Sequence, residues 1–269
     1  YFLLKLLLTI SISLFFPNFI MSKKIIAIIQ ARMGSTRLPG KVMMKINGKP
    51  ILEHVIERVL ESKLISDLVV ATTTLSLDDE IESYSKKNKI KIFRGDSNDV
   101  LDRFYRCSKL FKANIIIRIS ADSPLIDPLI IDKCISKFHE NKKLDYLSNT
   151  INKKNNYWCE NYNGFPIGIA VEVFRFKALE KAWRESSSLS DREHVTEYIW
   201  KNSKFFNLDY VENENNKSDL RLVVDTKEDF NFIKKFIESH SIDKSVTFNQ
   251  LINIIDNGSL IRSNSGKLL

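Results

Sequence analysis

The chain has 269 residues, of which 43% are hydrophobic and 28% are charged, so it can bury the core of one large globular domain. Its eight glycines and six prolines are too few for a fibrous or disordered chain. The net charge of +8 has three interpretations: a nucleic-acid binder, a site for a small anion, or only the lysine-rich usage of an AT-rich genome. Since no zinc-finger, homeodomain or RNA-binding signature accompanies this charge, we expect no nucleic-acid partner.

Residues 1–20 form an apolar run, YFLLKLLLTISISLFFPNFI, that stops directly before Met21. Two interpretations are open: a signal peptide or membrane anchor, or sequence that lies upstream of the true start at Met21. We favour the second, because the apolar core is shorter than a bilayer-spanning helix needs and shows no A-x-A cleavage pattern. We therefore expect no membrane partner and a cytoplasmic location. The cysteines are odd in number and widely spaced, which suits reduced thiols in that compartment: Cys107, Cys134 and Cys159.

Short β-branched runs alternate with amphipathic segments of helical length from Ile25 onward. Strands are predicted over 25–29, 68–71, 90–93, 115–119 and, later, 220–224. Helices are predicted over 50–62, 77–88, 99–112 and 128–140. This alternation predicts parallel βαβ units and hence an α/β fold, a Rossmann-like, mostly parallel sheet covered by helices on both faces.

The order loosens after Asn149. A polar loop or lid is predicted over 151–162, followed by a strand over 167–174, helices over 177–186 and 192–201, and a polar tail over 259–269. In open α/β sheets, ligands bind at the carboxyl ends of the strands. We therefore expect one site to gather the residues that follow Ile29, Ala71, Ile119 and Val224.

The first candidate for that site is the stretch QARMGSTRLPGKVMMKINGK at 30–49. Seven basic residues and no acidic one lie between Lys23 and Leu52. A glycine-containing loop at a strand end exposes backbone N–H groups to an anion, and arginine and lysine add charge-assisted contacts to phosphate oxygens. The pattern is neither a P-loop nor a dinucleotide fingerprint, and a basic surface loop is the alternative. We assign nucleotide contacts in this loop to Ala31, Arg32, Gly34, Ser35, Arg37 and Lys41.

The stretch AIIQARMGSTRLPGKVMMKINGKPILEHVIERV resembles the signature loop of the cytidylyltransferases that activate sugar acids. These are the acylneuraminate and 3-deoxy-manno-octulosonate enzymes, with the branch typified by spore coat polysaccharide biosynthesis protein F the most similar. The resemblance continues, in order, through VVATTT, FRGDSNDVLDRFY, RISADSPLIDP, REHVTEYI and RLVVDTKEDF. It covers nearly everything from Lys24 to about Ile237.

This resemblance implies the fold of nucleotide-diphospho-sugar transferases and an enzyme that moves CMP from CTP to a sugar acid, releasing pyrophosphate, for surface polysaccharide or glycan biosynthesis. The expected organisation is an apolar extension at 1–21, a cytidylyltransferase domain at 22–240, and a C-terminal helix and polar tail at 241–269. A homodimer is a possible assembly. Two alternatives remain: a nucleotidyltransferase that uses another base or sugar, and a catalytically silent nucleotide-binding partner in polysaccharide assembly.

Two aspartates are candidate Mg²⁺ ligands. Asp122 directly follows a predicted buried strand, where its carboxylate would face the triphosphate, and hard cations at reacting phosphates prefer carboxylate ligands. Asp225 could be a plain helix cap on the residues alone, but the resemblance implies that it is the second metal ligand. We expect Asp127 to cap a helix and Asp229 to be a solvated helix residue. The predicted catalytic residues are Arg32, Lys41 and Asp122.

The residues that recognise the base and the sugar are harder to identify from the sequence. Thr72 follows a strand end, and Arg94 lies in a block that resembles the nucleotide-facing segment of the family, together with Asp99 and Arg103. A carboxylated sugar needs a cation and partners for its hydroxyls, so we assign the acceptor to Arg192, Glu193 and His194. Ala170 stands where many relatives of this branch have aspartate or glycine.

Overall fold

The structure is a computed structural model that describes residues 23–150 and 163–257. The expectations for residues 1–20, for the loop over 151–162 with Cys159, and for the tail over 259–269 lie outside the described residues.

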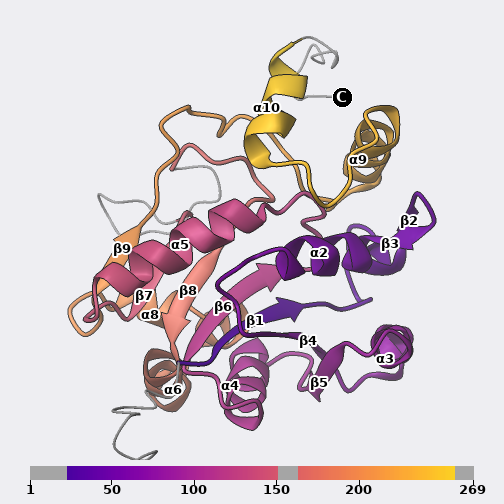
Figure 1. Cartoon of the computed structure of the whole chain (residues 1–269). Helices are drawn as coiled ribbons and strands as arrows, with labels where there is room; N and C mark the ends of the chain where they lie inside the picture. Colours follow the sequence, from indigo (N-terminus) through magenta and orange to yellow (C-terminus); the bar gives the residue numbers. More distant parts are fainter. Residues whose placement is uncertain (1–22, 151–162, 258–269) are drawn as a thin grey trace, which may run out of the picture.

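Within these ranges the main sheet has seven strands in the order β5-β4-β1-β6-β8-β7-β9 (Figure 1). Strand β1 pairs in parallel with both β4 and β6, and β4 pairs in parallel with β5. Strand β8 is antiparallel to both of its neighbours, and β9 pairs in parallel with β7. The predicted α/β fold with a mostly parallel sheet is confirmed. The strands are β1 (Ile25–Gln30), β4 (Asp67–Thr73), β5 (Lys91–Gly95), β6 (Ile115–Ser120), β7 (Tyr146–Ser148), β8 (Glu172–Arg175) and β9 (Leu208–Tyr210), with a separate hairpin of β2 (Lys45–Ile46) and β3 (Lys49–Pro50).

The helices follow the strands in the order that the sequence predicts. The helix predicted over 128–140 has these bounds, and its cap is Asp127, whose carboxylate accepts from the Leu129 and Ile130 N–H groups, as expected. The helices are α2 (Ile51–Leu60), α3 (Asp79–Lys87), α4 (Val100–Leu110), α5 (Pro128–Glu140), α6 (Phe176–Glu185), α7 (Leu189–His194), α8 (Glu197–Lys201), α9 (Lys227–Ser239) and α10 (Phe248–Asp256), with short 3-10 turns η1 (Lys41–Met43) and η2 (Ser76–Asp78).

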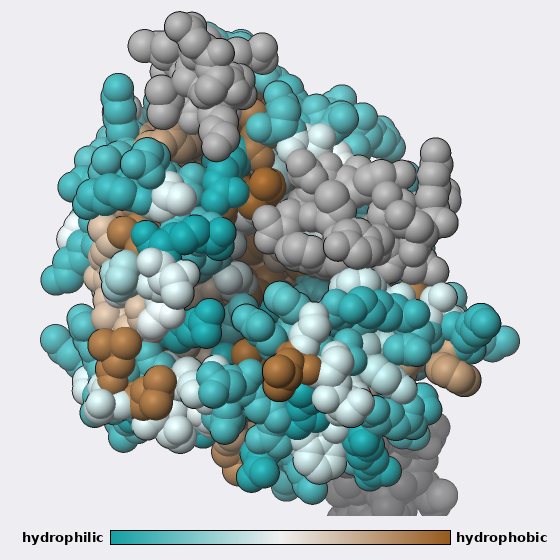
Figure 2. Space-filling model, turned by 180° about the vertical axis from the view of Figure 1, so that it is seen from behind, coloured by the Kyte–Doolittle hydropathy of each residue, from teal (hydrophilic) through white to brown (hydrophobic). Residues whose placement is uncertain are grey.

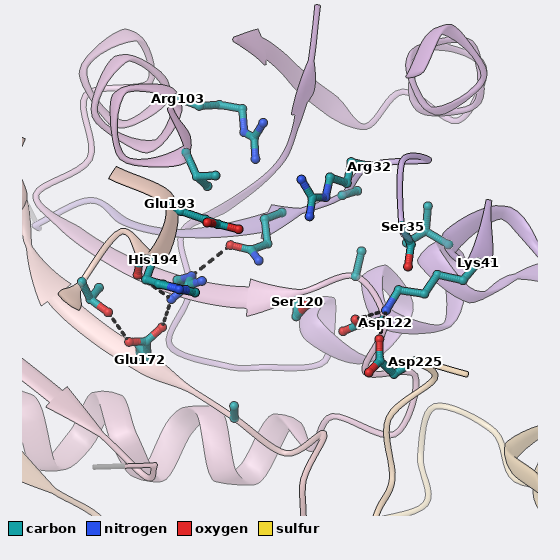
Figure 3. A pocket seen from close by; sticks show the side chains of 18 of the residues that line it. Arg32, Ser35, Lys41, Arg103, Ser120, Asp122, Glu172, Glu193, His194 and Asp225 are labelled. Carbon is teal, nitrogen blue, oxygen red and sulfur yellow. Dashed lines mark hydrogen bonds and ion pairs between the residues drawn. The ribbon is translucent and has the colours of Figure 1, made fainter. Parts of the chain in front are cut away.

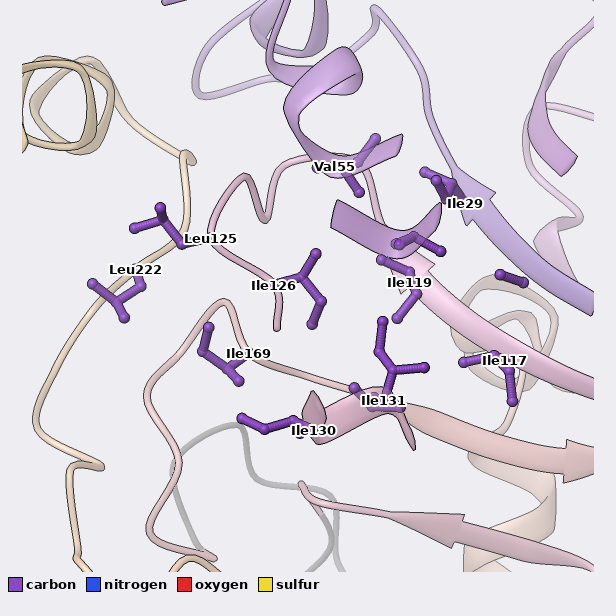
Figure 4. Packing of buried hydrophobic residues seen from close by; sticks show 14 of the residues in the cluster. Ile29, Val55, Ile117, Ile119, Leu125, Ile126, Ile130, Ile131, Ile169 and Leu222 are labelled. Carbon is purple, nitrogen blue, oxygen red and sulfur yellow. The ribbon is translucent and has the colours of Figure 1, made fainter. Parts of the chain in front are cut away.

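The core lies in two layers because β1 is apolar on both faces. Ala27 and Ile29 pack with α2, α5, α9 and α10, whereas Ile26 and Ile28 pack with α4, α6 and α8. Figure 4 shows the first layer, where Ile29 and Ile119 from neighbouring strands meet Val55 of α2. A strand buried on both faces reads as a continuous apolar run, which is why the IIAII pattern predicted this strand.

Residues 220–224 are not a ladder strand, contrary to the prediction. Arg221 makes one isolated bridge, with Ile167. The neighbouring amides bond to two loops instead: the Leu222 N–H donates to the Ile167 carbonyl (2.7 Å) and the Val224 N–H donates to the Asp122 carbonyl (2.9 Å). The apolar pattern is therefore that of an extended segment buried beside the sheet, and its second bond places Asp122 next to the residue after Val224.

The helix predicted over 192–201 is two short helices, α7 and α8. Val195 separates them with a φ of 61°. A β-branched residue in this left-handed region cannot continue a right-handed helix, so the chain turns there. Thr196, the next residue, is buried and faces the sheet.

Arg58 joins α2 to the C-terminal part of the chain. Its side chain is buried and donates to three backbone carbonyls, those of Ile126 (2.6 Å), Asp243 (2.7 Å) and Val246 (2.6 Å). Burial lowers the pKa of this guanidinium, and the charges of Asp127 and Asp243 partly offset that effect. The segment that leads into α10 is thus held by the helix that follows the basic loop.

None of the helices within residues 23–150 and 163–257 has the length and apolar content needed to cross a bilayer. The face shown in Figure 2 is mostly hydrophilic, with hydrophobic residues scattered over it. Cys107 and Cys134 are buried free thiols, and burial raises the pKa of each to about 12, as suits the structural role predicted for them.

Candidate active site

The basic loop leaves the sheet between two strands that fix its start. The Ala31 N–H donates to the Ala71 carbonyl of β4 (3.1 Å), and the Ala121 N–H donates to the Gln30 carbonyl (3.0 Å). The loop then folds on itself, because the Met33 carbonyl accepts from both Ser35 and Gly40 (2.8 Å each). Gly40 adopts a φ of 70°, a conformation that glycine takes without strain, and the η1 turn that follows it carries Lys41.

Lys41 and two aspartates form a cluster that we call the acid end of the site. The Lys41 Nζ lies 2.6 Å from Asp122 Oδ2 and 3.1 Å from Asp225 Oδ1 (Figure 3). The three side chains are only 10%, 20% and 13% exposed, so the ion pairs are shielded from bulk water. One ammonium group therefore holds together two carboxylates that are 103 positions apart, one after β6 and one after the extended segment.

Two arginines and a helix cap support Asp225. Arg37 reaches its carboxylate from the exposed side (2.7 Å), and Arg221 reaches it from the other (3.2 Å). Arg221 also pairs with Asp229, whose carboxylate accepts from the Asp225 and Thr226 N–H groups (3.0 and 2.9 Å). Asp229 is therefore part of a capping box and not the solvated residue that we predicted. Burial raises the pKa of Asp229, but the bonds from Arg221 and the two amides outweigh it, and the pKa is lowered overall.

A second group of charges, which we call the arginine end, comprises Arg32, Arg103 and Arg118. Arg118 of β6 stands directly opposite Glu172 of β8 and pairs with it (2.6 Å). The other oxygen of Glu172 accepts from the hydroxyls of Tyr146 and Thr196 (2.5 Å each). Burial and the charge of Glu172 raise the pKa of Tyr146, so this hydroxyl stays protonated and donates.

One pocket of about 600 Å³ connects the two ends. Its floor is made of the carboxyl ends of β1 and β6, and its walls come from the basic loop, α4, β8 and the α7–α8 turn. Strands β4 and β5 lie on one side of β1 and β6 lies on the other, so the pocket opens at the point where the strand order reverses. This is where open α/β sheets bind ligands.

Comparison with known proteins decides the family. A family model described as cytidylyltransferase matches residues 26–256. The chain belongs to the cytidylyltransferase family. Its members are nucleotidyltransferases, so the chain is an enzyme of that class, and the predicted resemblance is confirmed.

Several similar proteins cover most of the chain. An uncharacterized protein of Methanocaldococcus jannaschii is 37% identical over 242 residues, 89% of this chain and 93% of that protein. The spore coat polysaccharide biosynthesis protein SpsF of Bacillus subtilis is 32% identical over 241 residues, 86% of this chain and 94% of that protein. The solved structure of a cytidylyltransferase from Leptospira borgpetersenii is 34% identical, with a TM-score of 0.79 over 87% of this chain and 94% of that one. A 3-deoxy-manno-octulosonate cytidylyltransferase of Geobacter sulfurreducens is 36% identical over 117 residues, 44% of this chain and 46% of that enzyme.

The structure of this cytidylyltransferase brings together most of the residues predicted for its site. Those that line the pocket are Ala31, Arg32, Ser35, Arg37, Lys41, Arg103, Asp122, Glu193, His194 and Asp225. The α7–α8 turn supplies Glu193 and His194, and the His194 carbonyl accepts from Arg118 (3.3 Å).

Four predicted residues do not line the pocket. Arg94 pairs with Asp79 and Glu82 of α3, so it holds that helix to β5 instead of facing a nucleotide. Arg192 pairs with Asp99, the cap of α4, and thereby ties α7 to α4 instead of facing the acceptor. Thr72 is fully buried inside β4. Gly34 is exposed on the loop with open space around it.

The sequence also contained a signal for residues that were not assigned. A charged side chain inside the buried run IIIRIS is costly unless it is paired, so Arg118 pointed to a carboxylate on a neighbouring strand. The partner, Glu172, lies in the equally apolar GIAVEVF. Neither spacing nor periodicity shows which carboxylate pairs with Arg118, because β6 and β8 are paired only by the tertiary fold.

The acid end fits a Mg²⁺ ion in its chemistry. Within residues 23–150 and 163–257, no trio of histidine, cysteine and acidic side chains is placed to hold a metal. Mg²⁺ in enzymes that act on phosphates is bound by one or two carboxylates plus the substrate, and Asp122 and Asp225 are the two carboxylates that would hold it here. The ammonium of Lys41 pairs with both carboxylates, so the negative charge of the two aspartates attracts a cation to this place.

Proposed function

We propose that the chain transfers CMP from CTP to a hydroxyl of a sugar acid, of the nonulosonic or octulosonic type, and releases pyrophosphate. The product would serve surface polysaccharide or glycan biosynthesis. The observation that carries the proposal is the acid end, where Asp122 and Asp225 share one cation at the mouth of the basic loop. The names of the relatives, spore coat polysaccharide biosynthesis and 3-deoxy-manno-octulosonate cytidylyltransferase, support a sugar-acid product.

The loop would hold the triphosphate. Lys41 lies at the same edge of the pocket as Ser35 (Figure 3), and Arg37 pairs with the same Asp225 carboxylate as Lys41, so these donors surround one region where phosphate oxygens can be bound. In the transfer, the acceptor hydroxyl oxygen forms a bond to the α-phosphorus while the bond from that phosphorus to the bridging oxygen breaks. Positioning and charge neutralisation supply most of the catalysis in such reactions. A Mg²⁺ ion held by Asp122 and Asp225 would neutralise charge on the phosphates.

The test is a matrix of substrates with pyrophosphate release as the readout. CTP, UTP, GTP and ATP are each combined with N-acetylneuraminate, 3-deoxy-manno-octulosonate and related acids, with Mg²⁺ and after its removal by a chelator. We expect turnover with CTP and one class of acid, lost on chelation. Equal turnover with all four nucleotides would remove the cytidylyl assignment, and turnover with neutral sugars alone would remove the sugar acid. The homodimer and the absence of a nucleic-acid partner stay predictions.

A further inference from the structure

Arg103 is a buried arginine whose charge has no carboxylate partner in the described part of the chain. It lies on the first turn of α4 and is 3% exposed. Its Nη1 donates to the Asp96 carbonyl (2.9 Å), whereas its Nε is buried without a hydrogen-bond partner. Arg58, the other buried arginine, uses all three nitrogens on carbonyls. A buried donor without a partner is expensive, so Arg103 is placed for something other than stability.

The fold makes room for this side chain. Gly95 ends β5 opposite α4, and a Cβ on it would lie 2.9 Å from Cγ and 3.2 Å from Cβ of Arg103. The φ of Gly95 is not in the left-handed region, so the backbone itself does not demand glycine there. The space is needed for the arginine stem, which directs the guanidinium into the pocket (Figure 3).

Two other guanidinium groups act on Arg103. Burial first, and then the charge of Arg32 and the smaller effect of Arg118, lower the pKa of Arg103 to about 10, against the opposite effect of Asp78 and Asp96. Arg118 is already neutralised by Glu172, whereas Arg32 makes no ion pair or hydrogen bond within the described residues. Two cations without carboxylate partners thus face the same pocket, and an anion between them would relieve both the repulsion and the missing hydrogen bond.

We propose that Arg103, together with Arg32, binds the carboxylate of the acceptor. The inference rests on the proposed function and names the group by which the enzyme would recognise a sugar acid. The sequence assigned Arg32 to the nucleotide and placed Arg103 in a nucleotide-facing block, and a phosphate of CTP offers the same chemistry as a carboxylate. We favour the acceptor because Lys41 and Ser35 lie at the other end of the pocket, where Arg37 pairs with Asp225. Glu193 and His194 lie beside Arg32 and Arg103 in Figure 3, on the wall where sugar hydroxyls would need partners.

The experiment measures binding by titration calorimetry for the whole chain and three variants. The ligands are 3-deoxy-manno-octulosonate and N-acetylneuraminate, each as the free acid and as the uncharged C1 amide, added with Mg²⁺ and an α,β-methylene analogue of CTP. Affinity for that analogue is measured separately. Arg103→Met removes the charge. Arg103→Lys keeps the charge but lacks the two parallel N–H donors of the guanidinium. The third variant is Arg106→Met. Arg106 lies on the same helix, is exposed and pairs with Asp102, so its variant is the control.

We expect Arg103→Met to weaken binding of the free acid about tenfold or more and binding of the amide by less than about threefold. Its affinity for the nucleotide analogue should be unchanged. The affinity of Arg103→Lys for the free acid should lie between those of the wild type and Arg103→Met, and the affinities of the Arg106→Met control should match the wild type. The melting temperature of Arg103→Met should not fall below that of the control, whereas a structural arginine would lower it without changing the preference for acid over amide.

Four results would overturn the inference. Equal weakening of acid and amide would leave the carboxylate without a role. Weaker nucleotide binding with unchanged acid binding would assign Arg103 to a phosphate. A wild type that binds neither acid would remove the acceptor class of the proposed function and this inference with it, whereas a wild type that binds the acid no more tightly than Arg103→Met does removes the inference alone.

Discussion

The two ends of the pocket handle the same kind of charge in opposite ways. At the acid end, Lys41, Asp122 and Asp225 neutralise one another, and Arg37, Arg221 and Asp229 extend the network. At the arginine end, among the residues that the structure describes, only Arg118 pairs with a carboxylate, and Arg103 donates to a single carbonyl. A paired network keeps its shape without a ligand, whereas an unpaired one gains from binding an anion. The difference matches the roles proposed for the two ends, positioning of the phosphates at the acid end and selection of the acceptor at the arginine end.

The largest effect should come from breaking the acid end. We expect Asp122→Asn to lower kcat by roughly a hundredfold or more, because the carboxylate that pairs with Lys41 and that would hold the Mg²⁺ ion against the phosphates is lost. Pyrophosphate release at saturating CTP measures it. Asp209→Asn, which breaks a half-exposed surface pair with Lys137, is the matched control and should keep wild-type kcat. Turnover retained in Asp122→Asn would separate the cluster from catalysis.

The arginine end can be perturbed without touching an arginine. Glu172→Gln removes the charge that neutralises Arg118 and leaves two hydroxyls facing a weaker acceptor. We expect the free energy of unfolding in urea to fall by about 2–4 kcal/mol. Because Arg118 then becomes a third cation without a carboxylate partner in the described residues, thermal stabilisation by added sugar acid should increase relative to the wild type. Unchanged stability would mean that Glu172 is not the counter-ion that the geometry indicates.

Substitution of Gly168, which lies outside the basic loop, should affect stability and activity more than substitution of Gly34 within that loop. A Cβ on Gly168, whose φ is 98°, would lie 2.5 Å from the Leu222 carbonyl carbon and oxygen, in the segment that carries Asp225. We expect Gly168→Ala to lower the free energy of unfolding by about 1–3 kcal/mol and to lower kcat as Asp225 shifts. Gly34→Ala meets nothing within 4 Å and should change stability by less than about 0.5 kcal/mol. Loss of CTP affinity in Gly34→Ala would instead support the prediction that the Gly34 backbone contacts a phosphate.

Among the changes expected to lower stability, the smallest effect comes from Asp67, a carboxylate outside the pocket that pairs with two lysines. Burial raises the pKa of Asp67, but its bonds with Lys91, the Leu68 amide and Lys24 lower it overall. A lowered pKa contributes stability that is present above the unfolded value of about 3.9 and is lost as pH falls through the folded value. Asp67→Asn should therefore cost about 0.5–1 kcal/mol at neutral pH and nothing measurable at the acid limit, as seen in urea unfolding from pH 7 to pH 2. A constant difference across that range would show that the pairing is not the cause.

The parallel half of the sheet and the loop were predictable because each depends on local pattern. The β-branched runs indicated β1, β4 and β6, and the rule that ligands gather at the carboxyl ends of strands was enough to place Asp122 near the basic loop that carries Lys41. The predictions that failed depended on tertiary contacts. Arg94 and Arg192 were expected at the site because arginine suits phosphate and carboxylate, yet each pairs with an acid on a neighbouring helix. Sequence cannot show which acid a cation meets first, and for the same reason the pairing of Arg118 with Glu172 was missed.

The clamp made by Arg58 gives the last helix a role in keeping the enzyme intact. A chain cut after residue 240 would retain every residue named at the pocket and would still lose two of the three carbonyls that Arg58 uses. The guanidinium would then be a buried cation at the base of α2, the helix that follows the basic loop. Loss of the final segment would thus destabilise the helix that follows the basic loop, although it removes no residue of the pocket.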